Sequence, residues 1–306
     1  MFLIIVNQII KMLLLMLVGW LCYRLKLIDE QGNKTLANIL LMVINPVLAV
    51  TALQTDYNSH LVSGLLMAYL LAAITQVGGI LISTALVKKA GNPDYAIERF
   101  SCTYANCGFI GIPLIQSVLG NEGVLYLTAY ITVFNLLTWT QGVALMTGKT
   151  SKKDIKKGLL SPMIIACVLG LILFFGRIRF PKVLADTLDY IGGMNTPLAM
   201  IIAGVSVAQT DLLKMLRNKS VYFASFIKLL VVPAFALCIL TLFHVDKTVA
   251  YTILIASACP AAATCTMFAL RFQKNYRYAS EIYAFSTICS LVTIPLFVYA
   301  AERLLV

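Results

Sequence analysis

Long apolar runs separated by short polar stretches follow one another along the whole chain. Each run is roughly 18 to 27 residues long, enough for a helix to cross the hydrocarbon core of a bilayer. Ten such runs can be distinguished, so the pattern predicts an all-α membrane protein with ten transmembrane helices. The expected spans are 2–24, 35–53, 61–87, 99–119, 122–147, 159–176, 184–208, 220–243, 249–270 and 281–302.

The basic residues are divided unequally between the two sides of these spans. Of the 24 Lys and Arg residues, 17 lie in loops that follow odd-numbered spans, and five lie on the opposite side. Loops rich in Lys and Arg stay in the cytoplasm. We therefore expect a multi-pass protein of the cell membrane with a cytoplasmic basic linker at 149–158 and both termini outside. The net charge of +11 is interpreted as this topology signal and not as a nucleic-acid surface.

Prolines interrupt matching spans in the two halves of the chain. Their separations, 151 and 147 residues, are close to half the chain length. Because each half has an odd number of spans, the second half must lie upside down relative to the first, as in many secondary transporters. The sequence predicts inverted five-helix repeats at 1–148 and 159–306, although unrelated prolines are also common in membrane helices. The interruptions are Asn45-Pro46, Pro113, Asn195-Thr196-Pro197 and Pro260.

The fourth and ninth spans contain sequences that disfavour a continuous helix. The fourth holds two glycines and a proline between Asn106 and Pro113, and the ninth holds Pro260 between Ser257 and Thr266. A break near mid-span frees N–H and C=O groups that lipid cannot satisfy. The freed helix N-termini favour an anion such as a carboxylate. We expect the two broken helices to cross at a binding site; kinks without a ligand are the alternative.

The candidate substrate-binding residues are the polar and helix-breaking residues of the four interrupted spans. A buried amide in a bilayer bonds either a neighbouring helix or a polar substrate, and both interpretations stay open for the three asparagines. Three other in-span amides, Gln76, Asn135 and Gln141, are expected to bond neighbouring helices. The candidates are Asn45, Asn106, Gly108, Pro113, Asn195, Pro260, Thr264 and Thr266.

Lys11 and Lys228 are the charged residues expected inside spans. Both are close enough to a membrane face for snorkelling, and the alternative is a counter-charge for a bound anion. No Asp or Glu is expected near the middle of a span. This weakens a cation-coupled mechanism, but coupling to Na⁺ or H⁺ stays open because carbonyls and hydroxyls can also hold Na⁺.

Motifs of enzymes and pumps are absent from the sequence. It has no phosphate-binding G-x-x-x-x-G-K-[ST] motif, and its eight cysteines form no C-x-x-C pair. Its two histidines, His60 and His244, are expected in outward loops, which argues against a histidine-based metal or catalytic site. We therefore predict no enzymatic activity, no metal and no resident cofactor.

Three stretches resemble the auxin efflux carrier family, including its bacterial members and the plant PIN carriers. They are Asn106–Pro113 (N-x-G-F-x-G-I-P), Thr196–Ala208 and the region Ser257–Pro295 with its late L-V-T-I-P. The resemblance covers nearly the whole chain. It implies a fold similar to that of bile-acid sodium symporters, in which spans one, two, six and seven form a scaffold. Spans three to five and eight to ten would form a mobile transport domain.

The resemblance also implies carboxylate substrates such as malate, malonate or auxin-like acids. The favoured function is a secondary carrier of small organic anions with an elevator-like movement of one domain. A membrane-embedded ligand sensor without transport is the main alternative, and a channel is another. The sequence leaves open the substrate, the direction of transport, the coupling ion and whether the chain forms a homodimer.

Overall fold

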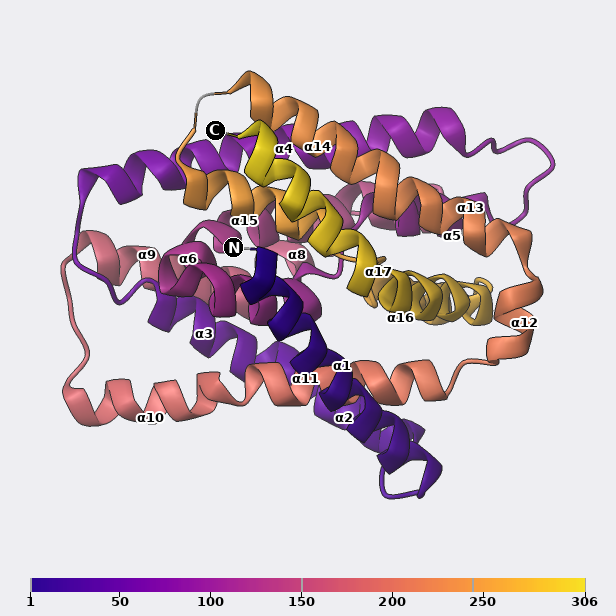
Figure 1. Ribbon diagram of the computed structural model, residues 1–306, viewed down its shortest axis with the longest axis horizontal. Coiled ribbons are helices and arrows are strands. Elements are labelled where there is room, and N and C mark those ends of the chain that lie inside the picture. Colours follow the sequence, from indigo (N-terminus) through magenta and orange to yellow (C-terminus); the bar gives the residue numbers. More distant parts are fainter. Residues whose placement is uncertain (1, 150, 244, 306) are drawn as a thin grey trace.

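The computed structural model describes residues 2–149, 151–243 and 245–305, and its regular elements are all helices (Figure 1). Seven helical stretches in these ranges are long and apolar enough to cross a membrane, and two shorter apolar helices accompany them. These findings confirm an all-α protein of the membrane class. The seven are Leu3–Arg24, Glu30–Ala52, Ser59–Leu86, Cys107–Thr147, Lys182–Ala208, Lys219–Leu242 and Tyr276–Leu304; the shorter two are Pro162–Phe175 and Lys247–Ala258.

Of the seven long stretches, three are single helices: α1 (Phe2–Arg24), α4 (Ser59–Leu86) and α17 (Tyr276–Leu304). The others are assembled from shorter helices, some of them joined through wide π-helical turns labelled η. The first half contains α2 (Glu30–Ile39), η1 (Leu40–Ile44), α3 (Asn45–Ala52), α5 (Tyr95–Thr103), η2 (Cys107–Gly111), α6 (Ile112–Leu137), η3 (Thr138–Gly142) and α7 (Val143–Thr147). The second contains α8 (Lys152–Leu159), α9 (Pro162–Phe175), α10 (Lys182–Gly193), α11 (Asn195–Ala208), α12 (Leu212–Arg217), α13 (Lys219–Phe226), η4 (Ile227–Val231), α14 (Val232–Leu242), α15 (Lys247–Ala258) and α16 (Thr264–Arg271).

Three of the π turns lead directly into a helix whose first turn contains a proline. These prolines are Pro46, Pro113 and Pro233. Proline has no N–H for the usual helical bond, and a wider turn accommodates its ring without ending the helix. The expected interruption at Pro46 is therefore only a π turn. The one expected at Pro197 is also slight, because Met194 between α10 and α11 keeps a φ of −70° and a ψ of −13°.

A sharp turn at Gly120 divides α6 into two helical segments. Gly120 has a φ of +65° and a ψ of −157°, a conformation that side-chain-bearing residues rarely adopt. The stretch Cys107–Thr147, 41 residues long, is therefore bent and not one straight helix. The turn falls between the predicted spans 99–119 and 122–147.

The helices pack in two groups. One group, the first bundle, consists of α1–α3 and α9–α11, and the other, the second bundle, consists of α4–α7 and α13–α17. In the view of Figure 1, α10 and α11 run along one edge and α4 and α14 along the opposite edge. Glycines bring α1 and α11 into backbone contact: Gly19 lies against Ile201, and Gly204 lies against the Met16 carbonyl. A side chain at either glycine would overlap the other helix, so these positions hold the first bundle together.

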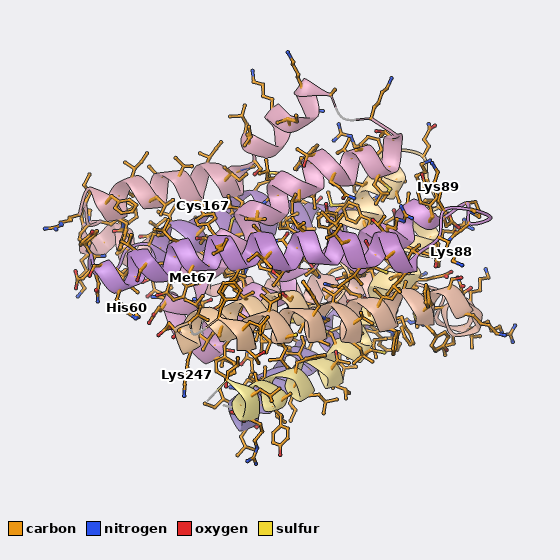
Figure 2. All side chains as sticks on the ribbon, turned by 90° about the horizontal axis from the view of Figure 1, so that it is seen from above. His60, Met67, Lys88, Lys89, Cys167 and Lys247 are labelled. Carbon is orange, nitrogen blue, oxygen red and sulfur yellow. The ribbon has the colours of Figure 1, made fainter. Side chains whose placement is uncertain are left out.

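The two ends of the molecule are polar and its sides are apolar. Figure 2 places His60 and Lys247 at one end of the helices and Lys88 and Lys89 at the other. Large apolar side chains are exposed between these ends, for example Leu66 (66% exposed), Leu81 (64%) and Ile172 (60%). Exposed apolar surface of this extent is typical of a protein surrounded by lipid.

Candidate functional site

Two extended segments cross in the second bundle, as the sequence predicts for the fourth and ninth spans. α5 ends at Thr103 and α15 ends at Ala258, and the residues that follow them lie antiparallel. The backbone N–H of Asn106 donates to the Pro260 carbonyl (2.8 Å), and the backbone N–H of Ala262 donates to the Tyr104 carbonyl (2.9 Å). Each break thus satisfies part of the backbone that the other leaves free, which an apolar bilayer requires.

Local sequence explains why both helices stop here. Pro260 has no N–H for the Ala256 carbonyl, and Cys259 before it adopts an extended conformation (φ −58°, ψ 148°). Asn106 also leaves the helical region, with a φ of −78° and a ψ of 51°. Beyond the crossing, η2 and α16 begin with N–H groups that have no acceptor inside their own helix. These two helix starts carry the partial positive charge expected at an anion site.

Two asparagines of the first bundle reach the crossing. The Asn195 side chain donates to the Asn45 side-chain oxygen (2.7 Å), and the Asn45 side chain donates to the Gly108 carbonyl (3.2 Å). Asn195 is 0% exposed and Asn45 is 4% exposed. The structure therefore brings Asn45, Asn195 and Gly108 together, in a chain of hydrogen bonds that joins the two bundles.

Several buried polar atoms around the crossing have no hydrogen-bond partner of good geometry among the described residues. The side-chain nitrogen of Asn106 is one, although the Tyr283 hydroxyl lies beside it, and the side-chain oxygen of Asn195 is another. The hydroxyls of Thr264 and Thr266, on the helix that follows the second break, are also unpaired. A buried polar atom without a partner costs about 1–3 kcal/mol. A polar ligand at the crossing would remove part of this cost.

Pro113 and Pro260 do not occupy equivalent places. Pro260 lies inside the second extended segment, whereas Pro113 is buried in the first turn of α6, beyond η2. The residues that face each other in the crossing are Ala105 and Ala261. Pro113 therefore lies beyond the crossing and is not the structural counterpart of Pro260, despite their similar spacing. Its role as a site residue stays a prediction.

The two in-span lysines have opposite environments. Lys11 is exposed on the surface of α1, where snorkelling is feasible. Lys228 in η4 is 0% exposed, and its ammonium donates to the Ser257 carbonyl (3.1 Å) in the last turn of α15. Snorkelling is therefore wrong for Lys228. Its burial depends on how η4 packs against α15, which its local sequence does not reveal.

The other amides within the predicted spans were expected to bond neighbouring helices, and the structure shows their partners. Gln76 donates to the Tyr130 carbonyl of another helix (3.0 Å), as expected, but Asn135 bonds the Ile131 carbonyl of its own helix (2.9 Å). Gln141 accepts from the Tyr104 hydroxyl (2.7 Å) and so supports the first extended segment. Sequence reasoning did not single out Ser286, whose hydroxyl accepts from the Ala261 amide (3.1 Å). A lone serine in an apolar span gives no signal of this contact.

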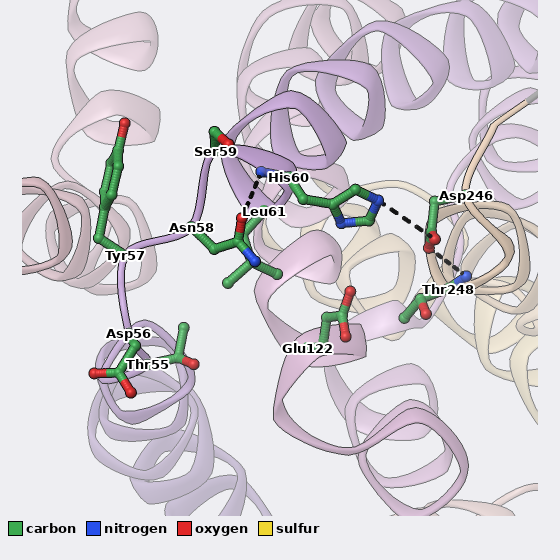
Figure 3. A pocket seen from close by; sticks show the side chains of 10 residues that line it. All are labelled: Thr55, Asp56, Tyr57, Asn58, Ser59, His60, Leu61, Glu122, Asp246 and Thr248. Carbon is green, nitrogen blue, oxygen red and sulfur yellow. Dashed lines mark hydrogen bonds and ion pairs between the residues drawn. The ribbon is translucent and has the colours of Figure 1, made fainter.

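A polar pocket of about 820 Å³ opens at one end of the molecule, away from the crossing (Figure 3). It is lined by the loop Thr55–Leu61 and by Glu122, Asp246 and Thr248, and His60 lies 3.9 Å from an Asp246 carboxylate oxygen. Its acidic side chains would repel an anion. No group of three potential metal ligands occurs among the described residues, and His244 lies outside them.

Comparison with known proteins identifies the family of this chain. The model of a family described as "Membrane transport protein" matches residues 4–157 and 146–298. The chain belongs to this family. It is the auxin efflux carrier family, so the resemblance of the three motifs is confirmed.

Similar proteins include an "Uncharacterized transporter" of Methanothermobacter thermautotrophicus, 27% identical over 299 residues that cover 95% of this chain and 96% of that protein. The "Uncharacterized transporter MJ1031" of Methanocaldococcus jannaschii is 22% identical over 95% of this chain and 96% of its own length. The "Uncharacterized transporter YfdV" of Escherichia coli K12 is 24% identical over 64% of each chain. This family membership makes the chain a membrane transport protein.

Proposed function

We propose that this protein is a secondary transporter of small organic anions, with carboxylates such as malate, malonate or auxin-like acids as substrates. The observation that carries the proposal is the crossing of two broken helices beside buried, unpaired polar atoms. Two helix starts, η2 and α16, point partial positive charge into the same region. The unpaired side-chain nitrogen of Asn106 and the hydroxyls of Thr264 and Thr266 supply donors for carboxylate oxygens.

The proposed architecture has ten spans in two inverted repeats of five. Each predicted span has a helical counterpart in chain order, which supports this assignment. The turn at Gly120 would separate the fourth and fifth spans, and the basic linker 149–158 would separate the repeats. The spans would be α1; α2–α3; α4; α5 with the first part of α6; the rest of α6 with α7; α9; α10–α11; α13–α14; α15–α16; and α17.

The proposed mechanism is a shift of the second bundle relative to the first. The first bundle would be the scaffold, because backbone contacts at Gly19 and Gly204 hold α1 and α11 together. The second bundle would carry the crossing, and the bound anion, from one side of the membrane to the other. Asn45 and Asn195 would contact the substrate or the crossing from the scaffold side.

Flux measurements with the purified protein in liposomes test this function. Uptake of labelled malonate, malate or an auxin-like acid should be saturable and should exchange with unlabelled substrate inside. A sensor would bind one of these acids, seen as a raised unfolding temperature, without any flux. A channel would give flux that does not saturate. Either result would overturn the proposal.

Orientation belongs to the same proposal, with both termini outside and the linker inside. A single cysteine at Lys153, introduced into a cysteine-free protein, should not react with an impermeant thiol reagent added to intact cells. The matched control is a cysteine at Asn58, which bonds the His60 backbone at the end of the molecule away from Lys88 and Lys89 and should react. Labelling at Lys153 with none at Asn58 would reverse the topology.

A further inference from the structure

Lys228 holds a charged group at the middle of the second bundle. It lies nine positions after Lys219, the first residue of its membrane-spanning stretch, or about 13 Å along the helix axis. The side chain is fully buried, and its ammonium donates to the Ser257 carbonyl at 3.1 Å. A charge at this depth is costly, so its position calls for a functional explanation.

The end of α15 offers this ammonium a set of free carbonyls. The helical partner of the Ala256 carbonyl would be Pro260, which has no N–H. The partner of the Ser257 carbonyl would be Ala261, but that amide donates to Ser286 instead. The carbonyls in this last turn therefore carry the partial negative charge of a helix C-terminus without the usual compensation.

A second helix C-terminus faces the same region. α5 ends at Thr103, and the Asn106 amide, which would otherwise bond back to Cys102, donates across the crossing to Pro260. Two half-helices thus direct free carbonyls towards the place where the backbone unwinds. In carriers with discontinuous helices, such half-helix ends and unwound carbonyls hold the coupling Na⁺.

The ammonium of Lys228 has no carboxylate partner among the residues that the structure describes. None of the ion pairs between described residues includes Lys228. The titratable groups that interact with it electrostatically are the buried thiols of Cys102, Cys107 and Cys259. Its recorded partner is the Ser257 carbonyl, and its positive charge would favour an anion at the neighbouring helix N-termini.

We propose that Lys228 is a tethered cation, whose ammonium takes the place of an alkali-metal ion at the two helix C-termini. The anion carrier would then work without Na⁺ or K⁺. The ammonium occupies the Ser257 carbonyl at one of these termini, and its charge would repel an alkali-metal ion from the neighbouring carbonyls. This inference rests on the proposed function, and it adds the coupling ion and the fixed charge that accompanies the substrate.

The first test uses the unmodified protein. Uptake of labelled malonate into liposomes is measured in NaCl, KCl and choline chloride at equal ionic strength, and equal rates within about twofold are expected, because no alkali ion takes part. A loss of tenfold or more in choline chloride would overturn the proposal. This comparison needs no variant, so it can overturn the proposal even if Lys228 variants fail to insert.

The second test compares two lysines with the same substitution. Lys228→Met keeps the length of the side chain and removes its charge, and it should lower malonate uptake about ten- to hundredfold. Lys11→Met is the matched control on the exposed surface of α1, and its uptake should stay within about twofold. Lys228→Arg, which keeps the charge, should retain more activity than Lys228→Met. Unchanged uptake by Lys228→Met would overturn the proposal.

A third measurement separates this inference from the proposed function. The unfolding temperature of the purified protein should be the same in the three salts, because no alkali ion binds at the crossing. Selective stabilisation by Na⁺ or K⁺ over choline would overturn the tethered cation, whether or not malonate is transported. Equal stability without transport of any carboxylate would overturn only the proposed function.

Discussion

The two broken helices meet at one crossing but are built differently. The first extended segment spans residues 104–106 and ends in Asn106, whose side-chain nitrogen is unpaired. The second spans residues 259–262 and contains Pro260, which three alanines follow in the sequence. An amide is suited to recognise a polar ligand, while small side chains let backbones approach closely. In the proposed transporter the first break would supply recognition, and the second would supply the close contact on which the crossing depends.

The breaks also end their helices by different means. The second break results from its own sequence, because Pro260 has no N–H to donate to the Ala256 carbonyl. The first contains no proline, and its extended backbone is held by Asn106 and Tyr104 bonding to the second segment. The first break therefore depends on the second for its shape, and substitutions in the two breaks should have unequal effects.

The largest effect is expected at Asn106. Asn106→Ala removes the unpaired side-chain amide from the crossing. Transport should fall about ten- to hundredfold, because this is the effect of losing one hydrogen bond to a charged ligand. Uptake or efflux is measured per amount of inserted protein. Lys11→Ala, on the exposed surface of α1, should change transport much less. Normal transport in Asn106→Ala with transport lost in Lys11→Ala would show that the site lies elsewhere.

Substituting the two prolines would test whether they differ as described. Pro260→Ala restores an N–H near the Ala256 carbonyl and removes a helix penalty of about 3 kcal/mol, which favours continuing α15 through the crossing. Transport should fall by about tenfold or more. Pro113→Ala, in the first turn of α6 beyond η2, should reduce it by less than about threefold. Equal losses in both variants would contradict the view that only Pro260 shapes the crossing.

A smaller effect is expected at Ser286, which supports only the second break. Ser286→Ala leaves the Ala261 amide without its acceptor and should cost about 1 kcal/mol. We expect a lower unfolding temperature and a two- to tenfold loss of transport. Ser280→Ala is a suitable control on the same helix, because its hydroxyl is exposed and bonds only its own helix. An unaffected Ser286→Ala protein would mean that the second break needs no support from α17.

Much of the fold was predictable because bilayer thickness sets the length of apolar runs. Polar residues such as Asn58 and Asp94 lie between these runs, and the described helices begin close to them. Gly120 separates two runs, although its positive φ was not anticipated. The crossing itself was also predictable, since glycine and proline in two apolar spans leave backbone groups that only another protein segment can satisfy.

The site was predictable only in part. Asn45, Asn195 and Gly108 do meet, but their pairing depends on the packing of helices about 150 residues apart, which no local pattern encodes. Proline spacing was misleading at Pro113, because a π turn accommodates a proline without breaking the helix. The burial of Lys228 depends in the same way on a distant helix. Lys11 and Lys228 therefore have similar sequence surroundings in apolar spans, although one is exposed and the other is buried.

The hydrogen bonds from Asn195 to Asn45 and from Asn45 to Gly108 have a kinetic consequence. The bond from Asn45 to Gly108 joins the two bundles, and the bond from Asn195 orients Asn45 within the first bundle, so the proposed sliding would first have to break the link at Gly108. Bonds of this kind between membrane helices are worth only about 0.6 kcal/mol on average. In the proposed movement the link would be a weak restraint: it would favour the arrangement described here, and thermal motion alone would be enough to release it.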